Sequence, residues 1–401
     1  MMKVISVNSD KTKKAFHNLP RKIYADNSYY VNPLDIEIEA IFNPEHNKCF
    51  KSGDAQRWIL QDKKGTTIGR IAAFYDEKKA MNNNLQPTGG IGFFECINDQ
   101  QAANQLFDTA KEWLSANGME AMDGPINFGE NFVNWGLLIE GYMQQAYGMP
   151  YHKPYYKDLF DKYGFREYFK QHTYHVDLNK GFPARMVKFA EYIASKPEYT
   201  FEHFRFDNAE KYISDLVETY NIIWSSYLES YAPLQSADVR QMVDEAKPII
   251  DEDLIWFAYH EGKPIAMVIV FPDVNQIIKP FKGKLNLINK IRFLIRKKRK
   301  LINRSRVLIA GVIPEFQKSG ILGALFLQYV KALDKKPQHK EIELSWVGDY
   351  NEEMIRIYKH IGGQHTKTHA TMRYLFDKNA PFERFTNESM KAKKNVKTAK
   401  E

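Results

Sequence analysis

Residues 307–333 have the sequence Val-Leu-Ile-Ala-Gly-Val-Ile-Pro-Glu-Phe-Gln-Lys-Ser-Gly-Ile-Leu-Gly-Ala-Leu-Phe-Leu-Gln-Tyr-Val-Lys-Ala-Leu. This pattern predicts a buried strand rich in β-branched residues, a proline stop, a glycine-bearing loop and an amphipathic helix. The free N–H groups of the first helical turn and the positive end of the helix dipole form an anion site. We therefore expect a coenzyme with a diphosphate at this helix start.

The spacing of this loop resembles the acyl-CoA loop of the GCN5-related N-acetyltransferases (GNATs), [Gln/Arg]-x-x-Gly-x-[Gly/Ala] after a strand that ends near Val-x-Pro. Val312, Pro314, Gln317 and Gly320 match, whereas Leu322 occupies the last motif position. Strand-to-helix turns also contain glycine for purely steric reasons, so an ordinary turn remains the alternative. The resemblance implies that acetyl-CoA or another acyl-CoA is held by Gly311, Val312, Ile313, Gln317, Lys318, Ser319, Gly320, Ile321, Leu322, Gly323 and Asn351.

The segment after the next predicted strand, 341–347, continues the resemblance. Asn351 stands where a helix would start, Tyr358 follows seven residues later, and Gly362 comes after the helix. In GNATs a tyrosine in this place often protonates the departing CoA thiolate, a role that suits a phenol with a pKa near 10. The resemblance implies this catalytic role for Tyr358, and packing in a helix face is the alternative.

The composition is that of a globular protein, with 401 residues, 44% hydrophobic and 14% aromatic. This length predicts two domains. No run reaches the roughly eighteen apolar residues of a membrane helix, and the N-terminus has no apolar signal region. Cys49 and Cys96 are the only cysteines, which excludes a disulfide framework and predicts a cytoplasmic protein.

The chain contains an internal repeat. A predicted hairpin at 57–74 recurs at 254–271, about 200 residues later, which predicts two stacked domains. We expect an α/β (α+β) protein of two tandem acyl-CoA N-acyltransferase-like domains, each a mixed, mostly antiparallel sheet flanked by helices. The predicted boundaries are 1–178, closed by a strand over 172–178, and 179–380, followed by a flexible basic tail over 381–401.

The two halves differ where a cofactor would bind. The first half has Asp99 at the corresponding helix start and no glycine, so an anion would be repelled there. We assign acyl-CoA to the second half alone.

The first half instead has a long loop, 124–156, rich in Gly, Pro, Asn and aromatic residues, which is typical of a binding loop. Its pattern resembles that of uncharacterised bacterial proteins with tandem acetyltransferase folds. Asn and Gly also serve ordinary turns. The predicted acceptor pocket consists of Asn127, Asn131, Asn134, Trp135, Glu140, Tyr151 and His152.

The general base is less well specified. Acylation of an amine requires a proton acceptor, and the oxyanion requires N–H donors such as those of 311–313. The candidate bases are Glu343, Asp349, His365 and His369. The sequence has no HExxH motif, paired Cys/His ligand set, Gly-x-Ser-x-Gly elbow or Walker loop, so we predict no metal site, serine esterase or nucleotide triphosphatase.

The net charge of +8 comes from one segment, 279–306. Twelve of the 57 Lys and Arg lie there without any Asp or Glu, so that 45 basic residues face 49 acidic ones elsewhere. This local charge gives no indication of a specific nucleic-acid partner. An apolar stripe within the segment predicts either a helix on an anionic membrane or an insertion that packs on its own domain. The residues of this apolar stripe are Leu287, Ile291, Leu294, Ile295, Leu301 and Ile302.

The predicted activity is transfer of an acyl group from acyl-CoA to a small-molecule or lipid-linked amine, in the cytoplasm or at the membrane periphery. One alternative is an aminoacyltransferase that modifies a cell-wall precursor from charged tRNA. Enzymes of that kind also pair two such folds but generally lack the loop formed here by Gln317 and Gly320. Another alternative is a non-catalytic protein that binds CoA or a lipid, as the departure at Leu322 suggests.

Overall fold

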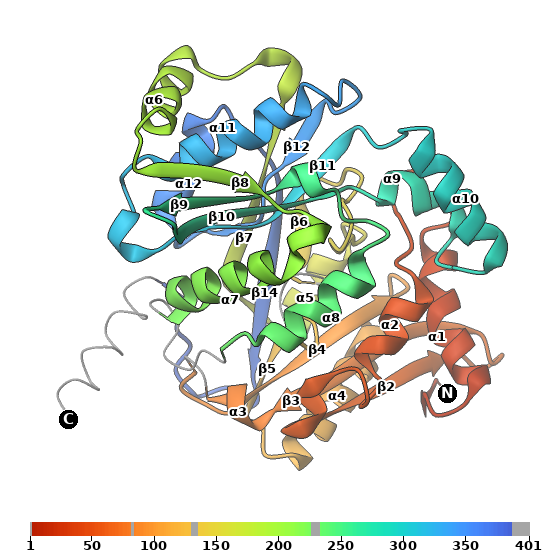
Figure 1. The fold of residues 1–401 in the computed structure, drawn as a ribbon. Coiled ribbons are helices and arrows are strands. Elements are labelled where there is room, and N and C mark those ends of the chain that lie inside the picture. Colours follow the sequence, from red (N-terminus) through yellow and green to blue (C-terminus); the bar gives the residue numbers. More distant parts are fainter. Residues whose placement is uncertain (1, 82–83, 130–134, 226–232, 387–401) are drawn as a thin grey trace.

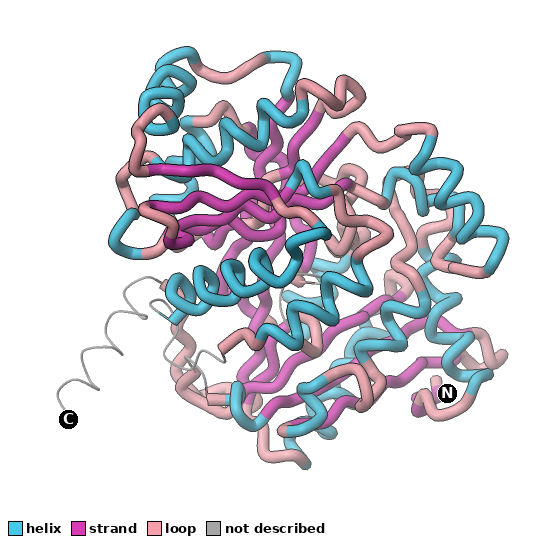
Figure 2. The backbone as a smooth tube through the Cα atoms, in the orientation of Figure 1, coloured by secondary structure: helices cyan, strands magenta, loops and turns pink. Residues whose placement is uncertain are grey.

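The computed structural model describes residues 2–81, 84–129, 135–225 and 233–386, and the statements below concern these residues. One continuous sheet of fourteen strands passes through both halves and carries helices on both faces (Figure 1 and Figure 2). The strands are β1 (Lys3–Ser6), β2 (Gly53–Gln61), β3 (Thr67–Asp76), β4 (Thr88–Cys96), β5 (Ala121–Gly124), β6 (Leu137–Glu140), β7 (Arg166–Asp177), β8 (Tyr199–His203), β9 (Ile255–His260), β10 (Lys263–Pro272), β11 (Arg304–Val312), β12 (Glu341–Glu343), β13 (Val347–Gly348) and β14 (Gln364–Leu375).

The α-helices are α1 (Asp10–Ile23), α2 (Asp35–Ile41), α3 (Glu77–Ala80), α4 (Gln100–Ala116), α5 (Tyr156–Tyr163), α6 (Ala184–Ala194), α7 (Ala209–Ser225), α8 (Ser236–Ala246), α9 (Asn275–Ile278), α10 (Leu287–Lys298), α11 (Ile321–Leu333) and α12 (Glu352–His360). Short 3-10 turns complete the chain: η1 (Lys48–Lys51), η2 (Leu178–Lys180), η3 (Phe206–Asn208), η4 (Glu252–Leu254), η5 (Lys279–Phe281) and η6 (Pro314–Phe316).

The repeated hairpins form as predicted. β2 pairs with β3, and β9 pairs with β10, both antiparallel. The second hairpin turns at Glu261 and Gly262, which both have positive φ, of 49° and 79°. Two such residues in a row give a tight turn whose twist matches that of the strands.

The order of the strands shows that the halves exchange their last strands. The sheet runs β1-β2-β3-β4-β5-β14-β7-β12-β11-β10-β9-β8, with β4–β5 and β11–β12 as its parallel pairs. β14, from the C-terminal end, pairs with β5 and β6 of the first half. β7, from the first half, pairs with β12 and β13 of the second.

The expectation that a strand over 172–178 closes the sheet of the first half is therefore wrong, because β7 lies between β14 and β12. A strand pattern specifies which side chains are buried but not which edge supplies the hydrogen bonds. The exchange makes the junction of the two halves the centre of the sheet.

Two large hydrophobic cores lie on the two sides of this junction. The core of the first half forms beneath α4 and α5, and the core of the second forms around α7 and α11. Asp99 caps α4, since its Oδ1 accepts a hydrogen bond from Ala102 N at 2.9 Å. The corresponding helix start of the first half is thus occupied by a carboxylate, as the sequence predicted.

Candidate functional site at the centre of the sheet

The parallel strands β11 and β12 pair over three residues and then separate. We call the place where the two strands diverge the strand parting. Arg304 to Arg306 lie opposite Glu341 to Glu343, after which β11 continues to Val312 with β10 as its only partner strand. The chain beyond β12 turns instead to β7, with which β13 pairs. Ser345 spans the start of this strand parting, because its Oγ donates to Leu308 O at 3.1 Å.

One backbone donor of β11 points into the strand parting. Ile313 N donates to Ile265 O of the β10 edge at 2.9 Å. Because alternate residues of an antiparallel strand face its partner, the N–H and C=O of Val312 point away from β10. The side chain of Gln317 confirms this direction, since its Nε2 donates to Val312 O at 3.4 Å. Of the predicted donors 311–313, Val312 thus faces the parting, whereas the N–H of Ile313 is already used.

The predicted diphosphate site lies next along the chain. Gly320 is the N-cap of α11 with φ 85°, and Ala324 N makes the first α-helical bond, to Gly320 O at 3.1 Å. The N–H groups of Leu322 and Gly323 precede this bond and have no partner in the helix ladder. Ser319 Oγ accepts from Ile321 N at 3.2 Å.

The two glycines of this loop have different surroundings. A Cβ on Gly320 would lie 2.4 Å from the ring of Phe189 in α6, so this glycine permits close packing in addition to its left-handed conformation. A Cβ on Gly323 would meet nothing within 4 Å. Leu322, at the motif position normally held by Gly or Ala, packs against the hydrophobic core of the second half. Space for an anion therefore exists beside Gly323, one residue after the usual position.

Tyr358 lies on α12, behind the chain that leads from β12 to β13. It is buried with Leu344 and Val347 in one core, and its ring centroid is 5.6 Å from that of Tyr174. Burial raises the pKa of the Tyr358 phenol, so it stays protonated at neutral pH. Asn351 caps this helix, because its Oδ1 accepts from Met354 N at 3.1 Å.

A cluster of buried polar side chains lies on the central strands β7, β12 and β14. The register places His369 opposite Gln171, Lys367 opposite Thr173 and Glu343 opposite His175. We call the following residues the polar cluster: Gln171, Thr173, Glu343, Lys367 and His369 of these strands, together with Trp135 of the loop beside them.

The predicted binding loop covers the polar cluster. Trp135 is fully buried, with its ring centroid 4.7 Å from that of His369 and 5.6 Å from that of Trp346. Trp346 belongs to the chain between β12 and β13, so this aromatic contact connects the polar cluster with the strand parting. Gly136 passes so near the sheet that an added Cβ would lie 2.7 Å from Gln171 Oε1.

Five buried atoms of the polar cluster find no hydrogen-bond partner among the described residues. They are Trp135 Nε1, Gln171 Oε1, Thr173 Oγ1, Glu343 Oε1 and His369 Nδ1. Leaving a buried polar group unpaired costs roughly 1–3 kcal/mol, so such groups are normally satisfied by water or by a ligand. Their concentration on one patch of the sheet indicates a site for a polar ligand.

Glu343 and Lys367 form a buried ion pair, with Nζ to Oε2 at 2.5 Å. Burial opposes ionisation of Glu343, but the positive charges of Lys367, Arg304 and Arg306 outweigh it and hold the pKa of the carboxyl below its usual value. Glu343 is the last residue of β12 that pairs with β11. The unpaired Oε1 of Glu343 is therefore on the residue at which β11 and β12 separate.

His369 is a neutral hydrogen-bond acceptor. Its Nε2 lies 3.2 Å from Pro150 O, which assigns the proton to Nε2 and leaves Nδ1 with a free lone pair. Burial lowers the pKa of His369 to about 3. Of the other bases considered, His365 contacts His172 and Thr368, and Asp349 pairs with Arg384.

The residues of the predicted acceptor pocket have different partners in the structure. Trp135 joins the polar cluster, and Asn127 is buried in the loop. Tyr151 packs against Tyr24 and Tyr30, at ring distances of 5.9 and 6.1 Å.

His152 and Glu140 have local partners. His152 Nδ1 accepts from Leu138 N at 3.0 Å, and burial lowers its pKa to about 3. Glu140 Oε2 accepts from Thr368 Oγ1 at 2.7 Å. Asn131 and Asn134 lie outside the described residues.

Gln171, Thr173 and Lys367 were not predicted as site residues, and Arg304 and Arg306 were assigned to a basic insertion. Both arginines are buried in β11, and Arg304 Nη2 pairs with Asp273 at 2.6 Å. The signal that could have found the three missed residues is the pair of polar runs at 171–175 and 364–371, each rich in His and Thr.

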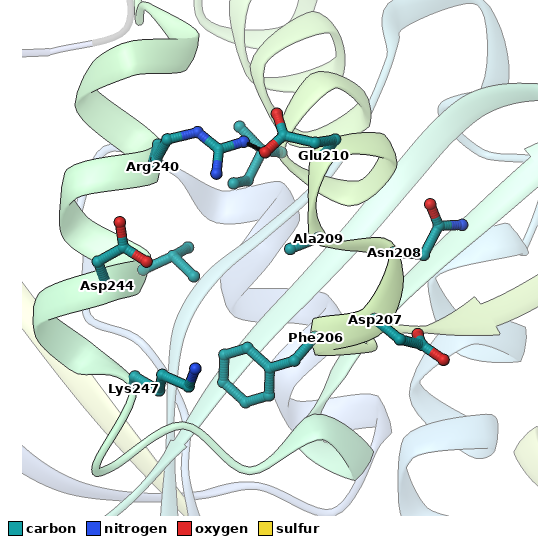
Figure 3. A pocket seen from close by; sticks show the side chains of 10 residues that line it. Phe206, Asp207, Asn208, Ala209, Glu210, Arg240, Asp244 and Lys247 are labelled. Carbon is teal, nitrogen blue, oxygen red and sulfur yellow. Dashed lines mark ion pairs between the residues drawn. The ribbon is translucent and has the colours of Figure 1, made fainter.

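A surface pocket elsewhere is unrelated to this site. Figure 3 shows it between η3, α7 and α8, where Glu210 and Arg240 form an ion pair. The pocket lies at the N-terminal end of α7. The other end of α7 faces β11, because Ile223 is the residue nearest to an added Cβ on Gly311. Among the described residues no group of three or more His, Cys, Asp or Glu side chains is placed to hold a metal ion.

No protein-family model matches the chain. The chain is 27% identical over 376 residues to a bacterial ceramide synthase of Caulobacter vibrioides, covering 92% of this chain and 96% of that protein. It is also 27% identical over 368 residues to protein YghO of Escherichia coli, covering 88% and 90% of the two chains.

Solved structures share the fold at low sequence identity. A tandem GNAT protein from the clavulanic acid biosynthesis pathway matches with a TM-score of 0.57 and 11% identity, over 96% of this chain and all of that one. A GCN5-related N-acetyltransferase from Sphaerobacter thermophilus matches with a TM-score of 0.53 and 11% identity, over 96% and 98%. The predicted fold is thus confirmed: the chain has the tandem GNAT fold.

Proposed function

We propose that the protein is an acyl-CoA-dependent N-acyltransferase that uses the strand parting of its second half. The observation that carries this proposal is the position of this parting between two groups of complementary chemistry. Val312 N–H faces it from β11, and the protonated phenol of Tyr358 lies behind the chain that leaves β12. The free N–H groups of Leu322 and Gly323 stand at the helix start nearby.

Each group has one role in the proposed reaction. The N–H groups at the start of α11 bind the diphosphate, and Val312 N–H donates to the thioester oxygen as its negative charge grows. The amine attacks the carbonyl carbon, so that a C–N bond forms and the C–S bond breaks. Glu343 Oε1 takes the proton that the amine loses, and Tyr358 gives its proton to the thiolate of CoA.

We further propose that the acceptor is a long-chain amino alcohol and that the acyl donor is a fatty acyl-CoA. The support is the likeness, over nearly the whole chain, to a protein named ceramide synthase, because a ceramide is the amide of such an amine. The polar cluster offers partners for an amine and a hydroxyl, including Glu343 Oε1 and His369 Nδ1.

The test is product formation by the purified full chain. We expect thiol release from palmitoyl-CoA in the presence of sphinganine, together with an amide whose mass equals the sum of both parts minus CoA. Acetyl-CoA and a short amine serve as the comparison pair. Thiol release without amide would mean hydrolysis and would contradict the proposal, whereas amide from the short pair alone would remove the lipid acceptor and leave the acyltransferase.

A non-catalytic CoA-binding protein is the second candidate, favoured by one observation. Leu322 packs into the core at the motif position where GNATs carry a small residue. Calorimetric binding of acyl-CoA with no turnover on any amine of the panel would support this candidate.

A further inference from the structure

Helix α10 presents an apolar stripe to solvent. Its five large apolar residues on one face are exposed by 74% (Leu287), 63% (Ile288), 52% (Ile291), 62% (Leu294) and 47% (Ile295). The spacing i, i+1, i+4, i+7 and i+8 places them on one side of the helix. With Leu301 they make up six of the sixteen exposed large hydrophobic residues in the described part of the chain, so the stripe is a concentrated patch.

The opposite side of α10 fixes it to the protein. Phe293 packs with the small core around Ile277, Phe281 and Ile302. Asn289 Nδ2 donates to Lys284 O at 2.8 Å. The expectation that the apolar side of this segment packs on its own domain therefore holds for Ile302 but is wrong for the stripe.

Further bonds orient α10 on the body of the protein. Arg296 Nη2 donates to Gln276 O at 3.4 Å, and Lys297 Nζ donates to Pro248 O at 2.6 Å. These contacts on the far side of the helix leave the apolar stripe facing outward. Figure 1 shows α10 at the edge of the molecule.

Positive charges border the stripe. Lys290 and Arg292 lie beside it on the helix, and Lys298, Arg299 and Lys300 follow at its C-terminal end. None of these five forms an ion pair with a residue that the structure describes, and the segment 279–306 contains no Asp or Glu. Long cationic side chains around an apolar stripe are typical of helices that lie in the interface of an anionic bilayer.

We propose that α10 docks the protein on an anionic lipid bilayer. The stripe enters the boundary between headgroups and acyl chains, and the flanking cations contact the anionic headgroups. The helix lies in the plane of the surface, because its twelve residues are too few to cross a bilayer, which takes about 20. No helix in the described part of the chain has the length and apolarity to span a membrane. This proposal does not depend on the proposed activity.

The test uses co-sedimentation of the full chain with vesicles of phosphatidylcholine alone or with phosphatidylglycerol. We expect binding to the anionic vesicles at low salt, weaker binding as salt rises, and little binding to neutral vesicles. The double variant Ile291→Ser/Leu294→Ser removes two exposed apolar side chains and should lower the partition coefficient about tenfold or more.

Two further variants complete the test. Leu85→Ser/Met242→Ser is the matched control, since both residues are 50% exposed outside the patch, and it should bind like the wild type. Replacing Lys290, Arg292, Lys298 and Arg299 with Gln should abolish the preference for anionic vesicles. Absence of binding at low salt, or equal binding by the Ile291→Ser/Leu294→Ser variant, would overturn the proposal. Binding lost with the charges but not with the apolar pair would mean that the cations adsorb to the headgroups without insertion of the stripe, and would also overturn the proposal.

Discussion

Gly323 offers the sharpest test of the diphosphate site, through Gly323→Glu with Gly323→Gln as its neutral control. An added Cβ there meets nothing within 4 Å, so both side chains fit. Both changes should preserve or raise stability, because replacing Gly within a helix removes a cost of roughly 1 kcal/mol and an acidic residue near the helix N-terminus is favourable. The two variants therefore differ mainly in one negative charge beside the proposed anion site.

The expected loss of affinity follows from that charge. Two unit charges 4 Å apart repel by about 1 kcal/mol in bulk water and about 4 kcal/mol near a protein surface. Gly323→Glu should therefore raise the Kd for CoA by between roughly fivefold and nearly a thousandfold, whereas Gly323→Gln should stay near the wild type. Calorimetric titration of CoA measures the Kd, and thermal unfolding checks the fold. Equal Kd values for the two variants would refute the placement of the diphosphate beside α11. Gly320 is less suitable, since any side chain there collides with Phe189.

Three further predictions follow from the same geometry. Tyr358→Phe should lower kcat while leaving the Kd for CoA within about twofold, because the phenol acts as the C–S bond breaks; a raised Kd with unchanged kcat would make Tyr358 a binding residue. Glu343→Gln should reduce the free energy of unfolding by about 3–5 kcal/mol in urea titrations, because it leaves buried Lys367 without its counter-charge. A change below about 1 kcal/mol would show that the pair is solvated. Because the folded pKa of Glu343 lies below its ordinary value of 4.5, this stabilisation should be complete above that value and lost as pH falls through the folded pKa. Finally, with the pKa of His369 lowered to about 3, the rate between pH 6 and 9 should follow deprotonation of the amine alone; a step near pH 6.5 that His369→Gln removes would contradict its burial.

Local sequence signals predicted the elements that carry the site. Alternating apolar residues located both hairpins, and the caps Asp99 and Asn351 marked helix starts that the structure contains. The loop from Pro314 to Gly320 also has the predicted order of strand, turn and helix. These features depend on backbone preferences over a few residues, which the sequence specifies directly.

The polar cluster could not be predicted because it depends on the exchanged strands. Lys367 and Glu343 are 24 positions apart in sequence, and each alone resembles a solvated surface charge. Thr173 and Gln171 come from the other half and meet β14 only through pairing across the junction. Likewise, Arg306 lies near the exposed cations of α10 in sequence, but β11 carries it into the interior.

The central claim, that acyl-CoA reacts in the strand parting of the second half, is tested most directly by a structure of the full chain with a non-hydrolysable CoA thioether. We expect one analogue per chain, with its diphosphate at the N–H groups of Leu322 and Gly323. Its carbonyl oxygen should accept from Val312 N–H, and its sulfur should lie within hydrogen-bond distance of the Tyr358 hydroxyl. An analogue bound in the first half at α4, or one whose sulfur lies away from Tyr358, would contradict the account.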